Sequence, residues 1–358
     1  MKWKVAICGL GAATQSIHLP AYHKLSDVQV VGGFDSVGGA RSFPFPLFDS
    51  IEQMITATRP DIVLVATPTD SHYELTCKAL EAGCHVFCEK PFMASVEQAR
   101  NVIELAEKCA KQVVVNNQYR FMEIHEASHR LFGSAEFGDL LFMSAQQTFF
   151  VTGDSEKGWR GQDLQRTCKE FGIHVMDLAR YYFDENPVSI RARMPKGGSP
   201  DGPDLLNLIE LEFSGDRVAH ITLDRLSKGA HRYLDIRLDG THGVIESSIG
   251  GKIGLHAGIR GGSRRPYLEL DTSLGGQARF YQQDRYRKIA SDPLDLFVNA
   301  TGKLMTAFVS ALADNTTPPC SAADNIHTLA LVYAAYESSR TNQTIYLQDR
   351  DGKPANDA

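Results

Sequence analysis

The first 120 residues alternate between short apolar runs and amphipathic helical patterns, and this alternation limits the possible folds more than any other feature. The run at residues 61–66 is almost wholly apolar, as expected for a strand covered on both faces. Further strands are predicted at 4–8, 28–34, 86–88 and 113–115, with helices at 12–25, 50–58, 71–82 and 95–109. Strand–helix alternation of this kind predicts a domain over residues 1–120 with a parallel sheet and helices on both faces.

The pattern changes after about residue 121, where strands follow one another without intervening helices. Strands are predicted at 140–150, 188–193, 205–213, 217–226, 232–238, 243–248 and 345–347, with helices at 123–132, 170–183, 292–314 and 322–341. Gly215 and Asp216 form a hairpin signal between two of these strands. The pattern predicts a second, α+β domain with a mixed or antiparallel sheet over residues 121–349, including the closing helices at 292–341, and a tail at 350–358.

Charge and cysteine usage exclude several classes of protein. The net charge of -6 and the absence of a basic block argue against a nucleic-acid partner. No apolar run approaches the roughly 18–20 residues that a membrane helix needs, so no membrane partner is expected. The seven cysteines form no C-x-x-C pair, which predicts reduced thiols in a cytoplasmic protein and no metal site.

The first predicted strand ends in a glycine turn, Cys-Gly-Leu-Gly-Ala-Ala-Thr, which matches the pattern G-x-G-x-x-G except at its last position. Gly9 permits the tight turn, and Gly11 lets the main chain approach a pyrophosphate. The pyrophosphate would lie at the start of the following helix, beside Ala12 and Ala13. Thr14 replaces the third glycine, which normally serves helix–strand packing, and loosens the match without removing the phosphate site.

Asp35 follows the second predicted strand. A carboxylate there can accept hydrogen bonds from the adenosine ribose and would repel the extra phosphate of NADP. We therefore predict NAD as the cofactor and consider NADP less favoured. Arg41, a few residues later, could meet such a phosphate, and an ordinary turn aspartate is the alternative interpretation of Asp35.

The run His-Val-Phe-Cys-Glu-Lys-Pro ends the strand at 86–88 with Glu89 and Lys90, and Pro91 stops it. Ligands of such sheets bind outside the carboxyl ends of the strands, so Lys90 lies where a ligand is expected. The glycine turn and this lysine together indicate a nicotinamide-dependent oxidoreductase.

Two runs are similar to the signature of the glucose–fructose oxidoreductase / inositol dehydrogenase / MocA (Gfo/Idh/MocA) family. They are Ala-Thr-Pro-Thr-x-x-His at 66–72 and Ala-Leu-x-Ala-Gly-x-His-Val-x-x-Glu-Lys-Pro at 79–91. Supporting matches are His18, Pro20 and Ala21, then Gln118, Arg120 and Phe121, and finally Glu170, Gly172, His174 and Asp177. The resemblance covers nearly the whole chain. It implies a doubly wound Rossmann domain, a C-terminal α+β domain with a large, open, mostly antiparallel sheet, and an active site between them.

The resemblance also implies roles for individual residues. In the family, the lysine of Glu-Lys-Pro contacts nicotinamide and substrate, and the histidine of Gly-x-His is the usual acid/base. Glu170 stands where the family typically has aspartate, and the usual glycine-rich lead-in is replaced by residues 165–169. The expected cofactor-binding residues are Gly9, Gly11, Ala12, Ala13, Asp35, Thr67, Pro68, His72, Glu89, Lys90 and Gln118. The expected substrate-binding residues are Lys90, Arg120, Trp159, Arg160, Glu170 and His174, of which Lys90, His174 and Glu170 are the predicted catalytic residues.

The residue types suit this chemistry. Removing hydride from a secondary alcohol requires a base for the hydroxyl proton, and the imidazole of His174 titrates near working pH. Lys90 can stabilise the developing alkoxide, and Glu89 can position that lysine. Glu170 shares a helix face with His174 and can orient it or contact a neighbouring hydroxyl. The alternative interpretation of Glu170 is a charge at the start of a helix that complements the helix dipole. For Trp159, the alternative to a substrate contact is a packing role. For His72, the alternative to a cofactor contact is a place in the cap region at the start of its helix.

Three functions remain open on the sequence alone. The leading prediction is an NAD-dependent dehydrogenase acting on a secondary hydroxyl of a sugar, glycoside or cyclitol. The second is an NAD-retaining glycoside hydrolase or lyase that oxidises its substrate transiently, which catalysis without net NADH would reveal. The third is a non-catalytic NAD-binding regulator, which the presence of both Lys90 and His174 disfavours. By resemblance, a homo-oligomer (dimer or tetramer) that pairs the open sheet faces is expected.

Overall fold

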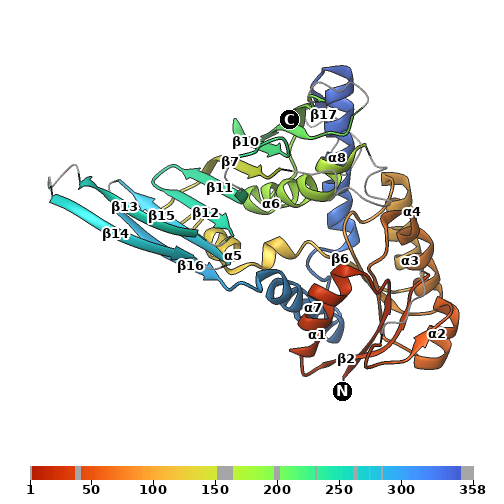
Figure 1. Cartoon of the computed structure of the whole chain (residues 1–358). Helices are drawn as coiled ribbons and strands as arrows, with labels where there is room; N and C mark the ends of the chain where they lie inside the picture. Colours follow the sequence, from red (N-terminus) through yellow and green to blue (C-terminus); the bar gives the residue numbers. More distant parts are fainter. Residues whose placement is uncertain are drawn as a thin grey trace. The chain divides into compact units, whose positions relative to one another are not determined.

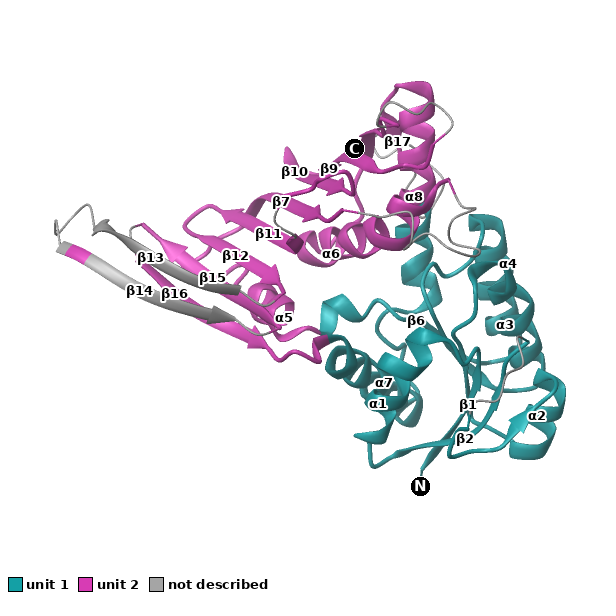
Figure 2. Ribbon diagram, viewed as in Figure 1, with its two compact units in different colours: residues 1–121, 297–330 teal, residues 122–296, 331–358 magenta. Residues whose placement is uncertain are grey.

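The computed structural model describes residues 2–36, 42–150, 164–196, 202–229, 232–250, 252–260, 265–273, 275–283 and 285–347. The chain divides into two compact units (Figure 2). Unit 1 comprises Met1–Phe121 and Phe297–Ala330, and unit 2 comprises Met122–Leu296 and Leu331–Ala358. The chain therefore leaves unit 1, builds most of unit 2, and returns to unit 1, as the colour sequence in Figure 1 shows.

Unit 1 is built on a six-stranded parallel sheet with the order β3-β2-β1-β4-β5-β6. Its strands are β1 (Trp3–Cys8), β2 (Val28–Phe34), β3 (Leu47–Phe48), β4 (Ile62–Val65), β5 (His85–Cys88) and β6 (Val113–Val115). All four residues of β4 are buried, as its apolar composition predicts. The order reverses between β1 and β4, which is the switch point where ligands of doubly wound sheets bind. The predicted doubly wound parallel sheet is confirmed.

The helices of unit 1 are η1 (Thr14–His18), α1 (Leu19–His23), α2 (Ile51–Thr58), η2 (Thr69–Ser71), α3 (His72–Glu81), α4 (Val96–Lys108), η3 (Gln118–Phe121) and most of α7 (Leu296–Asp314). Two of these helices, α2 and α4, begin at serine caps. Ser95 accepts a hydrogen bond from the Gln98 main-chain nitrogen at 3.1 Å. The Gln98 side chain in turn accepts from Ala94 at 3.2 Å, so the predicted capping pair forms with a one-residue shift.

Helix α7 corrects the predicted domain boundary. The sequence pattern placed the helices at 292–341 in the second domain, but residues 297–330 cluster with unit 1. The reason is packing, because Leu304, Met305 and Phe308 join the core formed by β-strand residues such as Ile7 and Phe87. Burying a large apolar side chain contributes about 1.5–3 kcal/mol. By length and composition α7 could cross a membrane, but these contacts account for its apolar character.

Unit 2 contains a nine-stranded sheet with the order β16-β15-β12-β11-β7-β10-β9-β8-β17. Its strands are β7 (Leu140–Thr148), β8 (Ser189–Arg193), β9 (Leu206–Phe213), β10 (Arg217–Asp224), β11 (Arg232–Gly240), β12 (Val244–Ile249), β15 (Gly276–Gln282), β16 (Arg285–Asp292) and β17 (Ile345–Tyr346). The β7–β10 pair is parallel, whereas the other pairs are antiparallel. Gly215 and Asp216 both have positive φ between β9 and β10, which confirms the predicted hairpin.

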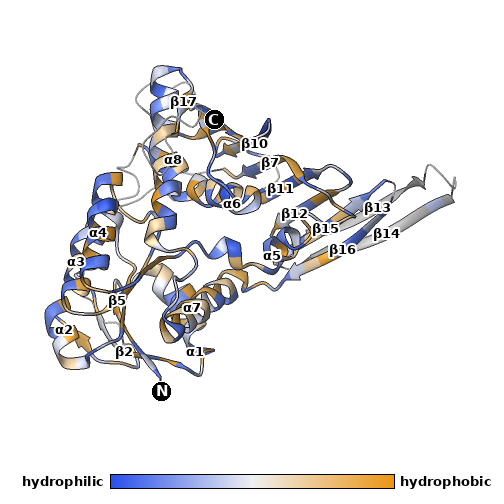
Figure 3. Ribbon diagram, turned by 180° about the vertical axis from the view of Figure 1, so that it is seen from behind, coloured by the Kyte–Doolittle hydropathy of each residue, from blue (hydrophilic) through white to orange (hydrophobic). Residues whose placement is uncertain are grey.

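One face of the nine-stranded sheet is covered and the other is polar. Helices α5 (Glu123–His129) and α6 (Ile173–Phe183) contact the sheet (Figure 1). Leu234, Ile236 and Leu238 of β11 are buried, whereas Asp235 and Arg237 between them lie on the opposite, open face. Hydrophobic and hydrophilic residues alternate along these strands, as the colours in Figure 3 show. The structure thus confirms an α+β unit with a large, open, mostly antiparallel sheet.

Two further elements complete the described chain. In the chain segment that connects β12 to β15, strands β13 (Lys252–Arg260) and β14 (Arg265–Ser273) form a separate two-stranded antiparallel ribbon (Figure 1). Helix α8 (Ala322–Thr341) begins in unit 1 and ends in unit 2. The predicted tail at 350–358 lies outside the described residues.

Candidate cofactor and catalytic site

The glycine turn follows β1 as the sequence predicts. Gly9 has φ of +94°, and a Cβ atom there would lie 2.4 Å from the Ala66 carbonyl oxygen, so only glycine fits. Its nitrogen donates to the Phe34 carbonyl at 2.8 Å and ties the turn to the end of β2. A Cβ atom at Gly11 would meet nothing within 4 Å. The turn therefore leaves open space at the start of the helix, where a pyrophosphate can approach the main chain.

Thr14, which departs from the glycine pattern, stabilises the turn. Its side chain is buried, and its hydroxyl donates a hydrogen bond to the Gly9 carbonyl at 2.6 Å. Thr14 also begins the π-helical turn η1, which continues into α1. The hydroxyl thus closes the turn onto the helix and compensates for the missing third glycine.

Asp35 lies beside the same turn. One of its carboxylate oxygens accepts a hydrogen bond from the Leu10 nitrogen at 2.7 Å. The carboxylate at the end of β2 and the open space at Gly11 fit the adenosine and pyrophosphate portions of NAD. Arg41 lies outside the described residues, so the structure does not locate the cation that could meet the phosphate of NADP.

The loop after β4 carries Thr67 and Pro68 and is joined to the loop after β5 by His72. The buried imidazole places Nε2 at 2.9 Å from the Thr67 carbonyl oxygen and Nδ1 at 3.0 Å from that of Pro91. Burial lowers the pKa of His72, and the nearby carbonyls oppose this effect. The side chain therefore supports the two loops, and its direct contact with a cofactor stays a prediction.

Glu89 is a buried carboxylate at the carboxyl end of β5. Its Oε1 atom lies 2.7 Å from Nε2 of His18 and accepts a hydrogen bond from the Asn116 amide at 2.7 Å. The Lys90 main-chain nitrogen donates to Oε2 at 3.1 Å. Burial alone would raise the pKa of Glu89, but its hydrogen bonds and the charges of His18 and Lys90 lower that pKa to about 2. Glu89 is therefore ionised near neutral pH.

Lys90 is partly buried directly after β5, and the peptide bond to Pro91 is cis. It directly follows Glu89, which is ionised in its buried position. Lys90 therefore occupies the position that the sequence predicts, at the carboxyl end of an interior strand. Its arrangement suits a group that stabilises negative charge on an oxygen.

The segment after β6 holds Gln118 and Arg120 in the short helix η3. Gln118 is buried, and an Nη atom of Arg120 lies 3.0 Å from a carboxylate oxygen of Asp324 in α8. Sequence reasoning assigned Arg120 to the substrate and did not identify Asp324. An acidic residue in the first turn of the last helix was the only signal for this pair, because the partners lie far apart in the chain.

Helix α6 and the turn before it carry the predicted catalytic residues of unit 2. Residues Cys168–Gly172 form the π-helical turn η6, which continues directly into α6. Glu170 lies in this turn, and His174 is buried one turn later. Nε of Arg166 lies 3.1 Å from a carboxylate oxygen of Glu170, and both side chains are largely buried. Arg166, which sequence reasoning missed, therefore holds a carboxylate that was expected to serve His174 or a substrate hydroxyl. Trp159 and Arg160 fall outside the described residues.

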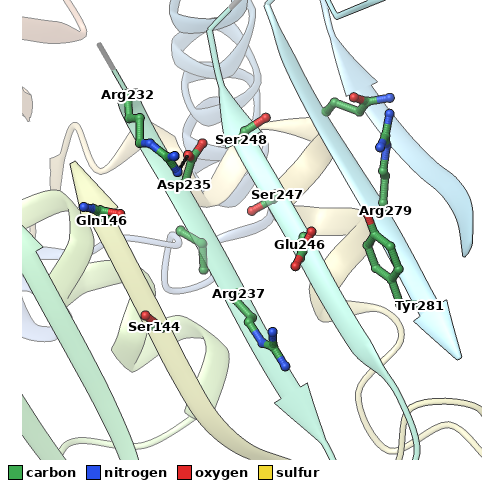
Figure 4. Close-up of a pocket in the computed structure, with 12 residues that line it drawn as sticks. Ser144, Gln146, Arg232, Asp235, Arg237, Glu246, Ser247, Ser248, Arg279 and Tyr281 are labelled. Atoms are coloured by element: carbon green, nitrogen blue, oxygen red, sulfur yellow. Dashed lines mark hydrogen bonds and ion pairs between the residues drawn. The ribbon is translucent and has the colours of Figure 1, made fainter. Parts of the chain in front are cut away.

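A shallow depression of about 400 Å³ lies on the open face of the nine-stranded sheet (Figure 4). It is lined by Ser144, Gln146, Arg232, Asp235, Ile236, Arg237, Glu246, Ser247, Ser248, Gln277, Arg279 and Tyr281. Its lining includes none of the predicted site residues that the structure describes. Within it, Arg232 and Asp235 form an ion pair at 2.9 Å.

Known proteins resemble this chain in sequence. D-glucoside 3-dehydrogenase of Escherichia coli (strain K12) is 30% identical over 50% of this chain, and the alignment covers 53% of that enzyme, about half its length. D-apiose dehydrogenase of Paraburkholderia graminis is 23% identical over 98% of this chain and 92% of its own.

Solved structures share the fold. An oxidoreductase from Agrobacterium radiobacter in complex with NAD+, L-tartaric acid and magnesium has a TM-score of 0.79 and 18% identity, covering 97% of this chain and 98% of its own. The aldose-aldose oxidoreductase from Caulobacter crescentus, in complex with glycerol, has a TM-score of 0.77 and 19% identity, covering 97% of this chain and all of its own (100%).

Two family models match consecutive parts of the chain. Residues 3–117 match the oxidoreductase family with an NAD-binding Rossmann fold, and residues 125–246 match the GFO/IDH/MocA C-terminal domain. These matches agree with the glycine turn, with Asp35 and with the Glu89-Lys90-Pro91 segment at the end of β5. The chain therefore belongs to the Gfo/Idh/MocA family of NAD-binding oxidoreductases.

Proposed function

We propose that this protein is an NAD-dependent dehydrogenase that oxidises, or forms by reduction, a secondary hydroxyl of a sugar, glycoside or cyclitol. The observation that carries the proposal is the ionised, buried Glu89 next to Lys90 at the carboxyl end of β5. The E. coli and P. graminis relatives act on a glucoside and on apiose, and an inositol 2-dehydrogenase of Corynebacterium glutamicum is 27% identical over 52% of this chain and 52% of its own. Glucosides, apiose and inositols all carry secondary hydroxyl groups.

In the proposed mechanism each residue has one task. The nicotinamide of bound NAD supplies the hydride acceptor. His174 takes the proton of the reacting hydroxyl, and the Lys90 ammonium stabilises negative charge on its oxygen. Glu89 positions Lys90 through a hydrogen bond to its main chain, while Asp35 and the turn at Gly9 and Gly11 would hold the adenosine and pyrophosphate portions of the cofactor.

The test is the absorbance of reduced nicotinamide, recorded with purified protein, NAD or NADP, and a panel of sugars, glycosides and inositols. We expect NADH formation that falls at least about 100-fold in Lys90→Ala and His174→Ala. Lys78→Ala and His23→Ala are matched controls, because Lys78 lies at the surface of α3 and His23 is exposed at the end of α1.

Other outcomes of the same assay contradict the proposal. Cleaved products without net NADH would favour the NAD-retaining hydrolase or lyase. NAD binding without turnover or cleavage on any panel member would favour a regulator. Turnover that both alanine variants retain would remove Lys90 and His174 from the mechanism.

We also propose a homo-oligomer formed through the open face of the nine-stranded sheet. Arg237, Glu246 and Arg279 are neighbours across three adjacent strands and line the depression there (Figure 4). A face that carries both charges can pair with a copy of itself. The solution mass of wild type and Glu246→Arg tests this, because a monomeric wild type would refute it.

We assign the protein to the cytoplasm from its seven free cysteines, a proposal that fractionation would test.

A further inference from the structure

A buried aspartate from elsewhere in unit 2 binds the first turn of the helix that carries Glu170 and His174. The two carboxylate oxygens of Asp204 accept hydrogen bonds from the main-chain nitrogens of Thr167, at 2.9 Å, and Cys168, at 3.1 Å. The first nitrogens of a helix have no acceptor within the helix, and a carboxylate there also complements the helix dipole. Asp204 therefore caps this helix from the loop before β9, 37 residues along the chain from Thr167.

Asp204 is itself fixed from a second element. The hydroxyl of Tyr336 in α8 donates to its Oδ2 atom at 2.7 Å, and the Asp204 nitrogen donates to the Leu164 carbonyl at 3.0 Å. Burial and the negative charge of Asp204 raise the pKa of Tyr336, so the phenol keeps its proton and remains a donor. The Asp204 carboxylate thus accepts a hydrogen bond from α8 and also faces the main-chain nitrogens of Thr167 and Cys168.

A buried arginine that directly follows β10 contacts the same turn. An Nη atom of Arg225 donates to the Thr167 hydroxyl at 3.1 Å, and its guanidinium lies 5.5 Å from the centre of the Phe171 ring. Phe171 directly follows Glu170, and Thr167 directly follows Arg166. Asp204 and Arg225 therefore contact the residues that directly follow Arg166 and Glu170, the two partners of an ion pair.

The turn held in this way is not an ordinary helical turn. Residues Cys168–Gly172 are π-helical, a conformation that is rare and occurs mostly as single turns, frequently at functional sites. An α-helical turn would rotate Glu170 relative to His174, so contacts that hold the wider turn also fix the relative orientation of these two residues. Asp204 and Arg225 supply such contacts at its amino-terminal end.

We propose that Asp204, held by Tyr336, is a positioning residue that sets the orientation of Glu170 and His174 for turnover. Its catalytic consequence rests on the proposed dehydrogenase function. Asp204 touches neither substrate nor cofactor in this proposal, and it acts by keeping the π-helical turn in register. A displacement of reacting groups by about 1 Å can cost roughly 100-fold in rate.

The chain offers a matched control for this proposal. Asp292 also accepts two main-chain hydrogen bonds from the first turn of a helix, from Glu123 at 3.0 Å and Ile124 at 3.1 Å. Both aspartates are buried, with exposures of 0% for Asp204 and 6% for Asp292, and both belong to unit 2. The helix that Asp292 caps, α5, carries no residue of the proposed mechanism. A loss of general stability would affect both variants, whereas a loss of positioning would affect only one.

The experiment compares Asp204→Asn, Tyr336→Phe and Asp292→Asn in the full chain. For Asp204→Asn we expect kcat to fall about 10- to 100-fold with the KM for NAD within about twofold of wild type. Amide hydrogen exchange should accelerate in residues 166–174. Tyr336→Phe should show the same changes to a smaller extent. Asp292→Asn should accelerate exchange in residues 123–129 and keep kcat within about twofold.

Each remaining outcome is decisive. Equal kcat in folded Asp204→Asn and Asp292→Asn, or unchanged exchange at 166–174 in Asp204→Asn, would overturn the proposal. If wild type turns over no substrate, the proposed function fails on its own. Hydrogen exchange and the NMR titration of His174 then test whether Asp204 positions the turn. A His174 titration curve that is identical in wild type and Asp204→Asn would overturn this role of Asp204.

Discussion

His18 and Glu89, 71 positions apart, meet in the buried interior of unit 1 with 2.7 Å between Nε2 and Oε1. Asn116 binds the same carboxylate oxygen from the end of β6. His18 of η1 and Asn116, directly after β6, therefore converge on Glu89, the residue that precedes Lys90. The contacts of His18 and Asn116 stabilise the ionised form of Glu89, which burial alone would disfavour.

Replacing Glu89 should destabilise the fold as well as impair turnover. Glu89→Gln keeps the shape but removes the buried charge that His18 and Asn116 compensate. We expect the free energy of unfolding to fall by about 3 kcal/mol, as for breaking a buried ion pair, with a loss of kcat as well. Urea unfolding measures the first effect. Glu52→Gln is the control, because the pKa of Glu52 is also lowered to about 2, first by its hydrogen bond to Lys78, but on the exposed surface. An equal change in both variants would contradict this interpretation.

The same carboxylate predicts a loss of stability in acid. The pKa of Glu89 is about 2 in the folded protein against an ordinary value of 4.5, so its contribution is present above pH 4.5 and is lost as the pH falls towards 2. The loss should amount to about 3 kcal/mol. Urea midpoints between pH 5 and 2 should therefore fall more steeply in wild type than in Glu89→Gln, and parallel curves would exclude this origin.

His125 should cause a second loss of stability in acid, which begins at a higher pH than the loss caused by Glu89. Burial lowers its pKa to about 3, and Nδ1 lies 2.5 Å from the Tyr182 hydroxyl. Below pH 6.5 the unfolded chain gains a proton that folded His125 does not, so stability falls as the pH falls from 6.5 towards 3. At pH 4.5 this costs about 2–3 kcal/mol. His125→Asn should reduce the loss between pH 6.5 and 4.5 by that amount in urea titrations. The control is His23→Asn, which changes an exposed histidine at the end of α1 and should leave this loss unchanged.

Thr14 should matter for the glycine turn through its hydroxyl rather than its size. Thr14→Val keeps the branched shape but removes the hydrogen bond to the Gly9 carbonyl. We expect a loss of about 1–3 kcal/mol in stability, because a buried acceptor loses its donor. We also expect weaker NAD binding, measured by quenching of protein fluorescence. Thr14→Ser should retain most of both, and equal defects in Val and Ser would point to packing instead.

Asp35 should set the preference between the two cofactors. Asp35→Asn keeps an acceptor for the Leu10 nitrogen but removes the charge that would repel the ribose phosphate of NADP. We expect the ratio of the NADP and NAD dissociation constants to move at least about tenfold towards NADP. Titration of both cofactors against the variant and wild type measures this ratio. Asp61→Asn is the control, because Asp61 also accepts a main-chain hydrogen bond but lies before β4. An unchanged ratio in Asp35→Asn would mean that the carboxylate does not face the ribose.

The local parts of this structure were readable from the sequence. The apolar run of β4, the turn at Gly9 and the hairpin at Gly215 each follow from spacing within a few residues. The unpredicted parts depend on partners that are remote in the chain. Asp204 caps a helix that it follows by 37 residues, and Arg120 pairs with Asp324. Periodicity says which face of an element is buried but not what covers it, and for the same reason α7 was assigned to the wrong unit.

The division of unit 1 into two chain segments affects how the protein is made. About 175 residues of unit 2 emerge from the ribosome before α7 appears. At elongation rates of about 5–20 residues per second this takes roughly 9–35 s, during which the β-sheet of unit 1 lacks the helix that covers Ile7 and Phe87. The nascent chain therefore presents an apolar surface over that interval. Fragments that end before residue 297 should need chaperones and aggregate on release, however complete their cofactor-binding signature looks.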